Sequence, residues 1–344
     1  MQKRIEIVIV FLGMILQSYA QPGKDPLFDD QRPLHIGLTL SMKEIKKTKE
    51  DSIYIGHIMY YKDSSGNSDS IKVGLKGRGN FRLNTCYFVP LSIKIGKKDA
   101  KGTPFEGNKK LKLVLPCQNQ KVKDILIVRE FVCYKIYEEV TNYAFRSRLV
   151  NLDITELRGS KTRNFQTKGI LVEDIDKIAK RFDAKPLKDM KITPSSFQDT
   201  ASLRFDMFQL MISNTDWSKS LQHNTKVIYH QPYYIAIPYD FDMSGLVDAP
   251  YSTVSVVNGE QLPITSVRER YYRGDCRGKE ITEFVRKEFI AKKEKYLSIP
   301  DQFKNELPEK EIRDMKDFLK YFFDILESDN LFERDVVERC KASE

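Results

Sequence analysis

Hydrophobic and polar positions alternate over short runs in the first third of the chain. These runs are rich in β-branched and aromatic residues, and glycine, asparagine, serine and lysine separate them. They read LHIGLTL, SIYIGHIMYY, SIKVGLKG, FVPLSIKIG and LKLVL. Alternation with a period of two predicts strands that bury one face.

The period changes near residue 124. Apolar positions then recur every three or four residues, at Ile125, Val128, Val132, Ile136 and Val140. This spacing predicts an amphipathic helix between about residues 124 and 142. RLVNLDI and KGILVED return to strand character, and helical patterns dominate beyond about residue 200, with EIRDMKDFLKYFFDILES as the clearest.

This order of elements predicts an α+β fold with two lobes. A β-rich lobe is expected at residues 30–175, with a mainly antiparallel sheet and one inserted helix. A mostly helical lobe is expected at residues 176–344, across a cleft from the sheet. The arrangement is the layout of an atypical protein-kinase-like fold, in which the first lobe binds the nucleotide and the second carries the catalytic and metal residues.

The N-terminus has the pattern of a signal peptide. A basic start, MQKR, precedes an apolar run from residue 7 to 16, and SYA places small residues before Gln21. The run is shorter than the roughly 20 apolar residues that span a bilayer. Residues 1–20 are therefore predicted to be cleaved, giving a bacterial-type secreted, periplasmic or cell-surface protein without a transmembrane helix. An uncleaved anchor is the alternative.

The charge balance argues against a nucleic-acid partner. Removal of Lys3, Arg4 and Glu6 with the signal changes the formal net charge from +9 to +8. Lysines alternate with acids, as in KEIKKTKED, and no long block of one sign occurs. Export of the protein weakens a nucleic-acid role further. The sequence does not indicate an oligomeric state.

Five cysteines leave at least one without an intramolecular partner: Cys86, Cys117, Cys133, Cys276 and Cys340. Their spacing lacks C-x-x-C pairs, which argues against a zinc site. Cys86 and Cys117 border strand-like runs in an oxidising compartment, so we predict that they form a disulfide, with Cα atoms within about 7 Å. Cys133 falls on the buried face of the predicted helix and is expected to be a free thiol.

Candidate chemistry gathers in two segments, SNTDWSKSLQHN and IPYDFDMSG. They contain Asp216, Asn224, Asp240 and Asp242. Such residues cluster in turns for backbone reasons alone, which is the plain alternative. Carboxylate and amide oxygens are also the ligands that Mg²⁺ shares with phosphate groups. Phosphoryl transfer needs this metal and a carboxylate that orients the attacking hydroxyl group.

These segments carry a family resemblance. Together with LKGRGNFR, KKLKLVLPC and KGILVED, and in this order, they resemble the spore coat protein H (CotH) type of atypical secreted protein kinases, in particular a branch of secreted bacterial proteins. The resemblance covers roughly residues 70 to 275. It implies that Asp216 is catalytic, that Asn224 and Asp240 bind metal, and that Asp242 is a second acidic metal position.

Two departures separate the chain from conventional kinases. Asp216 and Asn224 are eight positions apart, which is wider than the H-R-D-x-x-x-x-N spacing. Asp242 stands where the D-F-G motif has glycine. The geometry of ordinary kinases is therefore not transferred to these residues.

The basic side chain that contacts phosphate is expected from the first lobe. Lys112 in KLKLVL and Lys94 in SIKIG lie on predicted strands, and Arg78 lies near a glycine-containing loop. Glu130 on the inserted helix is expected to pair with that lysine, and Glu173 in ILVED to line the nucleotide pocket. Solvated surface charges are the alternative for each.

Other residues have weaker claims. His223 is a candidate base or, alternatively, a structural hydrogen-bonding partner of the same loop. Trp217 is expected to anchor that loop in the core. A cluster of arginines could hold a phosphorylated or acidic substrate, although ion pairs are the alternative use: Arg268, Arg270, Arg273 and Arg277.

The sequence therefore favours a secreted phosphotransferase, a protein kinase that uses ATP and Mg²⁺ or Mn²⁺ on protein hydroxyl groups. A catalytically degenerate kinase-fold module for surface binding or assembly is the first alternative, and a metal-dependent hydrolase is the second. The sequence names no substrate, and it does not distinguish phosphate transfer from nucleotide transfer.

Overall fold

The computed structural model describes residues 25–48, 53–63, 65–79, 81–117, 123–188, 190–257 and 259–342. The predicted signal peptide at residues 1–20 lies outside these ranges. Across them, no helix is both long enough and apolar enough to cross a membrane.

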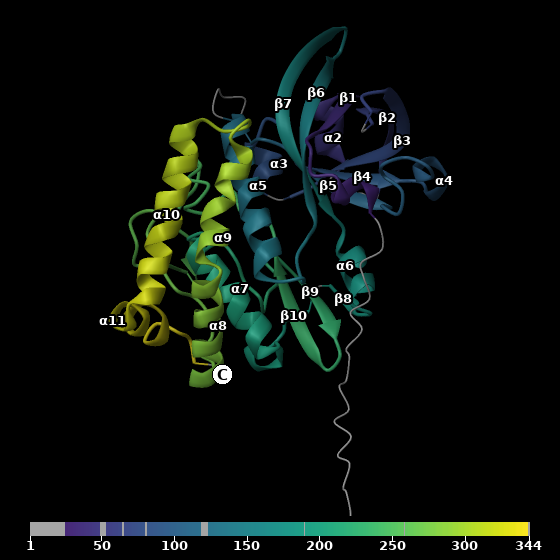
Figure 1. Ribbon diagram of the computed structural model, residues 1–344. Coiled ribbons are helices and arrows are strands. Elements are labelled where there is room, and N and C mark those ends of the chain that lie inside the picture. The colour runs from purple at the N-terminus through teal and green to yellow at the C-terminus, as the bar shows by residue number, and fades with distance from the viewer. Residues whose placement is uncertain are drawn as a thin grey trace, which may run out of the picture.

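Strands of the first half close into a seven-stranded barrel (Figure 1). The strand order around the barrel is β1-β2-β3-β4-β5-β7-β6, with β6 returning to β1. The strands are β1 (Leu34–Leu40), β2 (Ile55–Lys62), β3 (Ser68–Gly77), β4 (Leu91–Ile95), β5 (Lys110–Val114), β6 (Ser147–Arg158) and β7 (Lys161–Glu173). The closing pair is parallel, with Leu34 opposite Val150, and the other neighbouring pairs are antiparallel.

The barrel interior is one apolar core, filled by every second residue of its strands. In β1 the side chains of Leu34, Ile36, Leu38 and Leu40 are all buried within it, because residues two apart share a face of a strand. Four short helices accompany the barrel: α1 (Pro26–Asp29), α2 (Met42–Lys47), α3 (Phe81–Thr85) and α4 (Lys97–Ala100).

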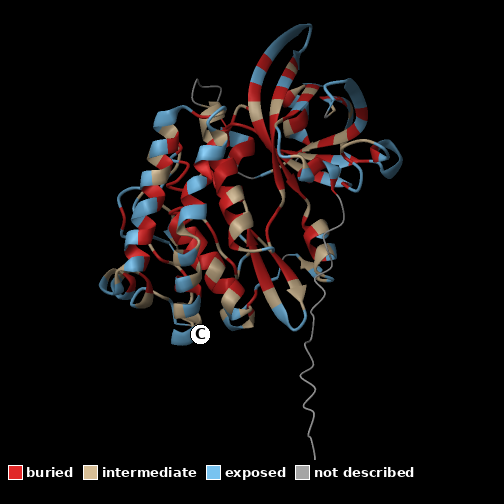
Figure 2. Cartoon of the chain, viewed as in Figure 1, coloured by how far each residue is buried: buried red, intermediate tan, exposed pale blue. Residues whose placement is uncertain are grey.

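A second core lies between the outside of the barrel and the helices of the second half. Helix α5 (Lys123–Val140) confirms the helix predicted near residues 124–142, and its buried face belongs to this core. Figure 2 shows buried residues on α5 and on the facing sides of the later helices. These helices are α6 (Ile175–Arg181), α7 (Asp199–Met211), α8 (Lys279–Ala291), α9 (Lys293–Ser298), α10 (Glu309–Glu327) and α11 (Asp329–Phe332).

The second half also contains β-structure. A three-stranded antiparallel sheet has the order β10-β9-β8, built from β8 (Lys185–Leu187), β9 (Thr225–His230) and β10 (Tyr233–Pro238). A small hairpin pairs β11 (Val256–Val257) with β12 (Glu260–Gln261). The remaining helical turns are η1 (Pro194–Ser196), η2 (Pro300–Phe303) and η3 (Glu333–Val337).

The predicted α+β fold class, a two-lobed protein-kinase-like architecture, is wrong. The first-half strands form a closed mixed barrel instead of a lobe sheet, because β1 pairs in parallel with β6 and leaves no free edge there. Helix α5 packs both against the outside of β6 and β7 and against the later helices. The second half is not mainly a helical lobe, since the β10-β9-β8 sheet, the β11–β12 hairpin and the largely non-helical segment that carries this hairpin, between β10 and α8, occupy much of it.

The cysteines follow the predicted pairing. Cys86 and Cys117 form a disulfide with their Cα atoms 4.5 Å apart, which confirms that prediction. Cys133 is free and buried, as expected. Cys276 and Cys340 form a second disulfide, with Cα atoms 4.8 Å apart, that the sequence analysis did not assign. Two disulfides are compatible with a secreted protein.

Candidate functional site

A cleft of about 680 Å³ lies where outer barrel residues face the loops around β9 and β10. Its volume is within the usual range for small-molecule sites. The structure brings six of the predicted site residues to its walls: Arg78, Lys112, Asp216, Asn224, Asp240 and Asp242.

A tight hairpin brings Asn224 back to Asp216. The main chains of Ser218 and His223 exchange two hydrogen bonds of 3.0 Å, so the chain reverses between them. The Asn224 Nδ2 group then donates to both the main-chain oxygen and Oδ2 of Asp216, each at 2.8 Å. Asn224 has a φ of 45°, a left-handed conformation that asparagine tolerates better than most residues.

The second carboxylate oxygen of Asp216 is also engaged. The Nε2 atom of His223 lies 2.9 Å from Asp216 Oδ1. This hydrogen bond raises the pKa of His223 above its ordinary value. Asp216 is one-third exposed to the cleft, and each carboxylate oxygen can accept more than one hydrogen bond. The carboxylate is therefore fixed in orientation and can still accept a hydrogen bond from a hydroxyl group.

The loop that carries Asp216 is anchored in the core. Trp217 is buried, and its indole donates to the Asn214 main-chain oxygen at 2.9 Å. The Asn214 side chain accepts from the Asp216 amide at 3.0 Å. Arg273 donates to the main-chain oxygens of Thr215 and Trp217. These contacts agree with the anchoring role expected for Trp217.

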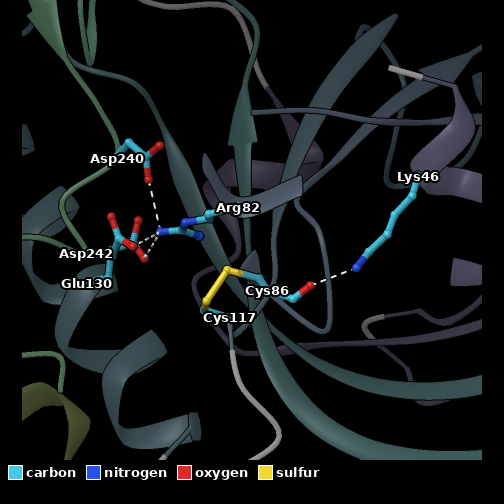
Figure 3. Close-up of a disulfide and its surroundings, with 7 residues drawn as sticks. All are labelled: Lys46, Arg82, Cys86, Cys117, Glu130, Asp240 and Asp242. Atoms are coloured by element: carbon cyan, nitrogen blue, oxygen red, sulfur yellow. Dashed lines mark hydrogen bonds and ion pairs between the residues drawn. A yellow bond between two sulfur atoms is a disulfide. The ribbon is translucent and has the colours of Figure 1, made fainter. Parts of the chain in front are cut away.

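A buried arginine joins three carboxylates at the other wall of the cleft (Figure 3). The NH2 atom of Arg82 lies 2.6 Å from Asp242 Oδ2 and 3.0 Å from Asp240 Oδ1. It lies 3.7 Å from Glu130 Oε2. Asp240 and Asp242 follow β10, Glu130 comes from α5 and Arg82 from α3. We call these four residues the Arg82 cluster.

Burial controls the protonation of the cluster. Burial raises the pKa of Glu130 to about 8 and that of Asp242 to about 6, against the opposing effect of Arg82. Burial also opposes the charge of Arg82, but Asp242, Asp240 and Glu130 together raise the arginine pKa well above its ordinary value. The guanidinium is therefore a permanent cation beside two carboxyl groups, Glu130 and Asp242, that hold their protons unusually well.

Lys112 enters the cleft from β5 without a polar partner. Its Nζ atom is buried and makes no hydrogen bond within the part of the chain that the structure describes. It lies 4.3 Å from the ring centroid of Tyr239 and 4.4 Å from that of Phe145. Burial, followed by the charges of Arg78 and Lys226, lowers the pKa of Lys112 well below its ordinary value. An unpartnered buried amine is unfavourable, so its surroundings suit an anionic ligand.

Other predicted residues lie elsewhere or serve the structure. Lys94 is exposed on the barrel exterior and lines a separate hollow. Glu173 is fully buried, bonded to Arg181 at 3.0 Å and to the Arg146 amide at 2.8 Å. Glu130 pairs with Arg82 instead of with a lysine.

The arginine cluster predicted as a possible substrate site makes internal contacts. Arg268 pairs with Asp248 and Asp314, and Arg277 pairs with Asp199. Arg270 and Arg273 donate to main-chain oxygens of the core. Their geometry agrees with the alternative use in ion pairs and structural hydrogen bonds.

Arg82 is the site residue that the sequence analysis missed. In the string FRLNTC it resembles an ordinary loop arginine, and its partners lie on segments far along the chain. The signal available in the sequence was its place just before Cys86, whose predicted disulfide fixes this segment.

The carboxylates of the cleft can be compared with the ligands that a divalent cation requires. Within the described ranges, no group of three histidine, cysteine, aspartate or glutamate residues is placed to hold a metal ion. Magnesium at phosphate sites often takes only one or two carboxylates and fills its shell with phosphate oxygens and water. Asp240 lines the cleft with 35% of its side chain exposed. Asp240 is therefore exposed enough to supply one carboxylate ligand of this kind.

Comparison with protein-family models, curated proteins and solved structures gave no significant match. The resemblance to the spore coat protein H family consequently rests on the sequence motifs alone.

Proposed function

We propose that the cleft binds ATP with Mg²⁺ or Mn²⁺ and transfers a phosphoryl group to a hydroxyl group of a protein substrate. The observation that supports this most is the unpartnered, buried Nζ of Lys112, which lines the same cleft as Asp216 and Asp240. A basic side chain and fixed carboxylates in one cleft suit an anionic phosphate chain beside a reacting hydroxyl group.

Each residue has a defined role in this proposal. Lys112 and Arg78 bind phosphate oxygens. Asp216, oriented by Asn224 and His223, accepts the proton of the attacking hydroxyl group. The new oxygen–phosphorus bond forms as the bond to the leaving diphosphate breaks. A divalent cation would be held by Asp240 and Asp242 and would neutralise charge on the triphosphate.

A second candidate is a binding or assembly module without catalysis. The contacts of Arg82 with Asp240, Asp242 and Glu130 favour it, because a guanidinium already compensates these carboxylates. A protein that only binds a partner has no need of an oriented Asp216 and an unpartnered Lys112 in one cleft, which is why transfer is preferred. No observation favours the third alternative, a metal-dependent hydrolase.

The decisive experiment is thermal unfolding of the protein from residue 21 onward, with ATP and Mg²⁺, Mn²⁺ or no metal. At about 100 times the dissociation constant, ATP with metal should add about 2.7 kcal/mol of stability. ATP consumption should be lost in Asp216→Asn while the stabilisation by ATP remains. Asp248→Asn is the matched control, because Asp248 lies outside the cleft lining and pairs with Arg268.

The outcomes separate the candidates. If ATP does not stabilise the wild-type protein under any metal condition, the kinase proposal is wrong and the binding or assembly module remains as the candidate function. Full ATP consumption by Asp216→Asn would remove Asp216 as the base.

A further inference from the structure

Helix α3 carries Arg82 but is too short to hold it alone. The helix has five residues, and isolated helices of this length are not stable in water. Its position depends on three anchors. Leu83 is buried in the barrel core, Lys46 donates to the Cys86 main-chain oxygen at 2.9 Å, and Cys86 forms the disulfide with Cys117.

The disulfide joins the two elements that supply the buried basic side chains of Arg82 and Lys112 to the site. Cys86 directly follows α3, and Cys117 lies three residues beyond the end of β5, which carries Lys112. The Tyr87 amide donates to the Cys117 main-chain oxygen at 2.8 Å and reinforces the connection. Both cysteines are almost fully buried, at 2% and 3% exposure. The bond is therefore a fixed part of the interior, and Figure 3 shows it beside the Arg82 cluster.

The charge of the cluster depends on where α3 is held. Glu130, Asp240 and Asp242 come from elements other than α3, so only the packing of α3 places the guanidinium among them. A long arginine side chain loses much rotamer freedom when it is fixed. Without Arg82, Asp240 and Asp242 would line, with no compensating guanidinium, a cleft that is proposed to accept a triphosphate, and like charges repel.

We infer that the Cys86–Cys117 disulfide is a positioning element of the candidate site: it holds α3 so that Arg82 neutralises the carboxylates and the cleft admits an anionic phosphate chain. This inference rests on the proposed function for its ligand. The placement of Arg82 by the disulfide can be tested without the ligand.

The first test compares two disulfide deletions. Cys86→Ala with Cys117→Ala should weaken binding of ATP with Mg²⁺, measured by isothermal titration calorimetry, by about tenfold or more. The matched control removes the other disulfide, Cys276→Ala with Cys340→Ala, and should bind within about twofold of wild type. Arg82→Met should show the same loss as the Cys86/Cys117 deletion, and combining them should add little, because both act through Arg82.

The second test needs no nucleotide. Amide hydrogen exchange at residues 240–242 should become faster in the Cys86/Cys117 variant and in Arg82→Met, and remain unchanged in the control. If the double variant does not fold, Lys46→Met, which removes a hydrogen bond to Cys86, should give the same exchange pattern. Unchanged exchange in the folded variants would overturn the inference.

The two tests separate this inference from the proposed function. Wild-type protein that binds no ATP, together with faster exchange in the variants, would remove the nucleotide function and keep the placement of Arg82 by the disulfide. Normal ATP affinity in the Cys86/Cys117 variant would overturn the role of the disulfide and keep the function.

Discussion

The side-chain amide of Asn224 is bonded to Asp216 twice, at the main-chain oxygen and at Oδ2, each at 2.8 Å. The family resemblance assigns Asn224 to a metal. Because its Nδ2 group is occupied by Asp216, a cation would have only the Oδ1 atom of this side chain. Asn224 is thus a positioning residue for Asp216, whether or not it also contacts a metal.

Asn224→Gly should lower turnover by about 10²-fold, because small misplacements of a reacting group have effects of that size. Glycine keeps the positive φ of 45° without strain, so this variant isolates the loss of the amide hydrogen bonds. Asn224→Ala should lose as much activity and unfold at a lower temperature, because alanine is strained at positive φ. Turnover and melting temperature should be measured together. Wild-type turnover in Asn224→Gly would show that Asp216 does not depend on this contact.

Lys112 should be the most reactive lysine of the folded protein. Its pKa is lowered by burial, so a larger share of its amine is neutral and nucleophilic near pH 7. We expect a small acylating reagent to modify Lys112 faster than the exposed Lys94, and ATP with Mg²⁺ to slow that reaction selectively. Peptide mapping by mass spectrometry measures both rates. Equal rates at the two lysines, with or without ATP, would contradict the assignment of Lys112 to the phosphate site.

The contrast between these lysines shows what the sequence could and could not predict. Ser92 lies opposite Lys112 and Lys94 opposite Lys110, and the alternation with buried leucines and isoleucines correctly points both lysines out of the barrel. The alternation of apolar and polar residues does not reveal which part of the outer face of the barrel is covered by other segments of the chain. Tyr239 and Phe145 cover Lys112, and they come from distant segments.

The sequence patterns did not predict closure of the barrel, for a similar reason. Period-two and period-three-to-four patterns are local, and they predicted the strands and helix α5 well. Pairing of Leu34 with Val150 joins segments far apart along the chain, and neither segment carries a signal for its partner. The Cys86–Cys117 bond was predictable because cysteine is itself a long-range signal in a chain that is expected to be exported.

His223 should shape the pH dependence of activity. Its hydrogen bond to Asp216 raises its pKa above the ordinary 6.5. At low pH the protonated imidazole donates a charge-assisted hydrogen bond to the Asp216 carboxylate, which competes with the hydrogen bond from the attacking hydroxyl group. Activity should therefore rise as the pH passes upward through the His223 pKa, and His223→Gln should lack that rise. A pH–rate profile of the variant identical to wild type would assign the titration to another group.

Glu130 should make the stability of the protein fall as the pH rises. Burial raises its folded pKa from the ordinary 4.5 to about 8. The folded state therefore holds a proton that the unfolded state has released. This contribution to stability is fully present below pH 4.5 and is lost progressively as the pH rises to about 8.

Glu130→Gln isolates this effect, because glutamine has the shape of a protonated glutamate and does not titrate. Asp242, whose pKa is raised to about 6, titrates in the same direction and remains in the variant. We expect the wild type to lose on the order of a few kcal/mol of unfolding free energy between pH 5 and pH 8 from this buried cluster. The variant should lose distinctly less. Urea unfolding at several pH values measures the difference, with Glu138→Gln, at a partly exposed position of α5 outside the Arg82 cluster, as the control. Parallel pH dependences in wild type and Glu130→Gln would mean that Glu130 is already ionised beside Arg82, and the Arg82 cluster would then be a buried ion-pair network without a stored proton.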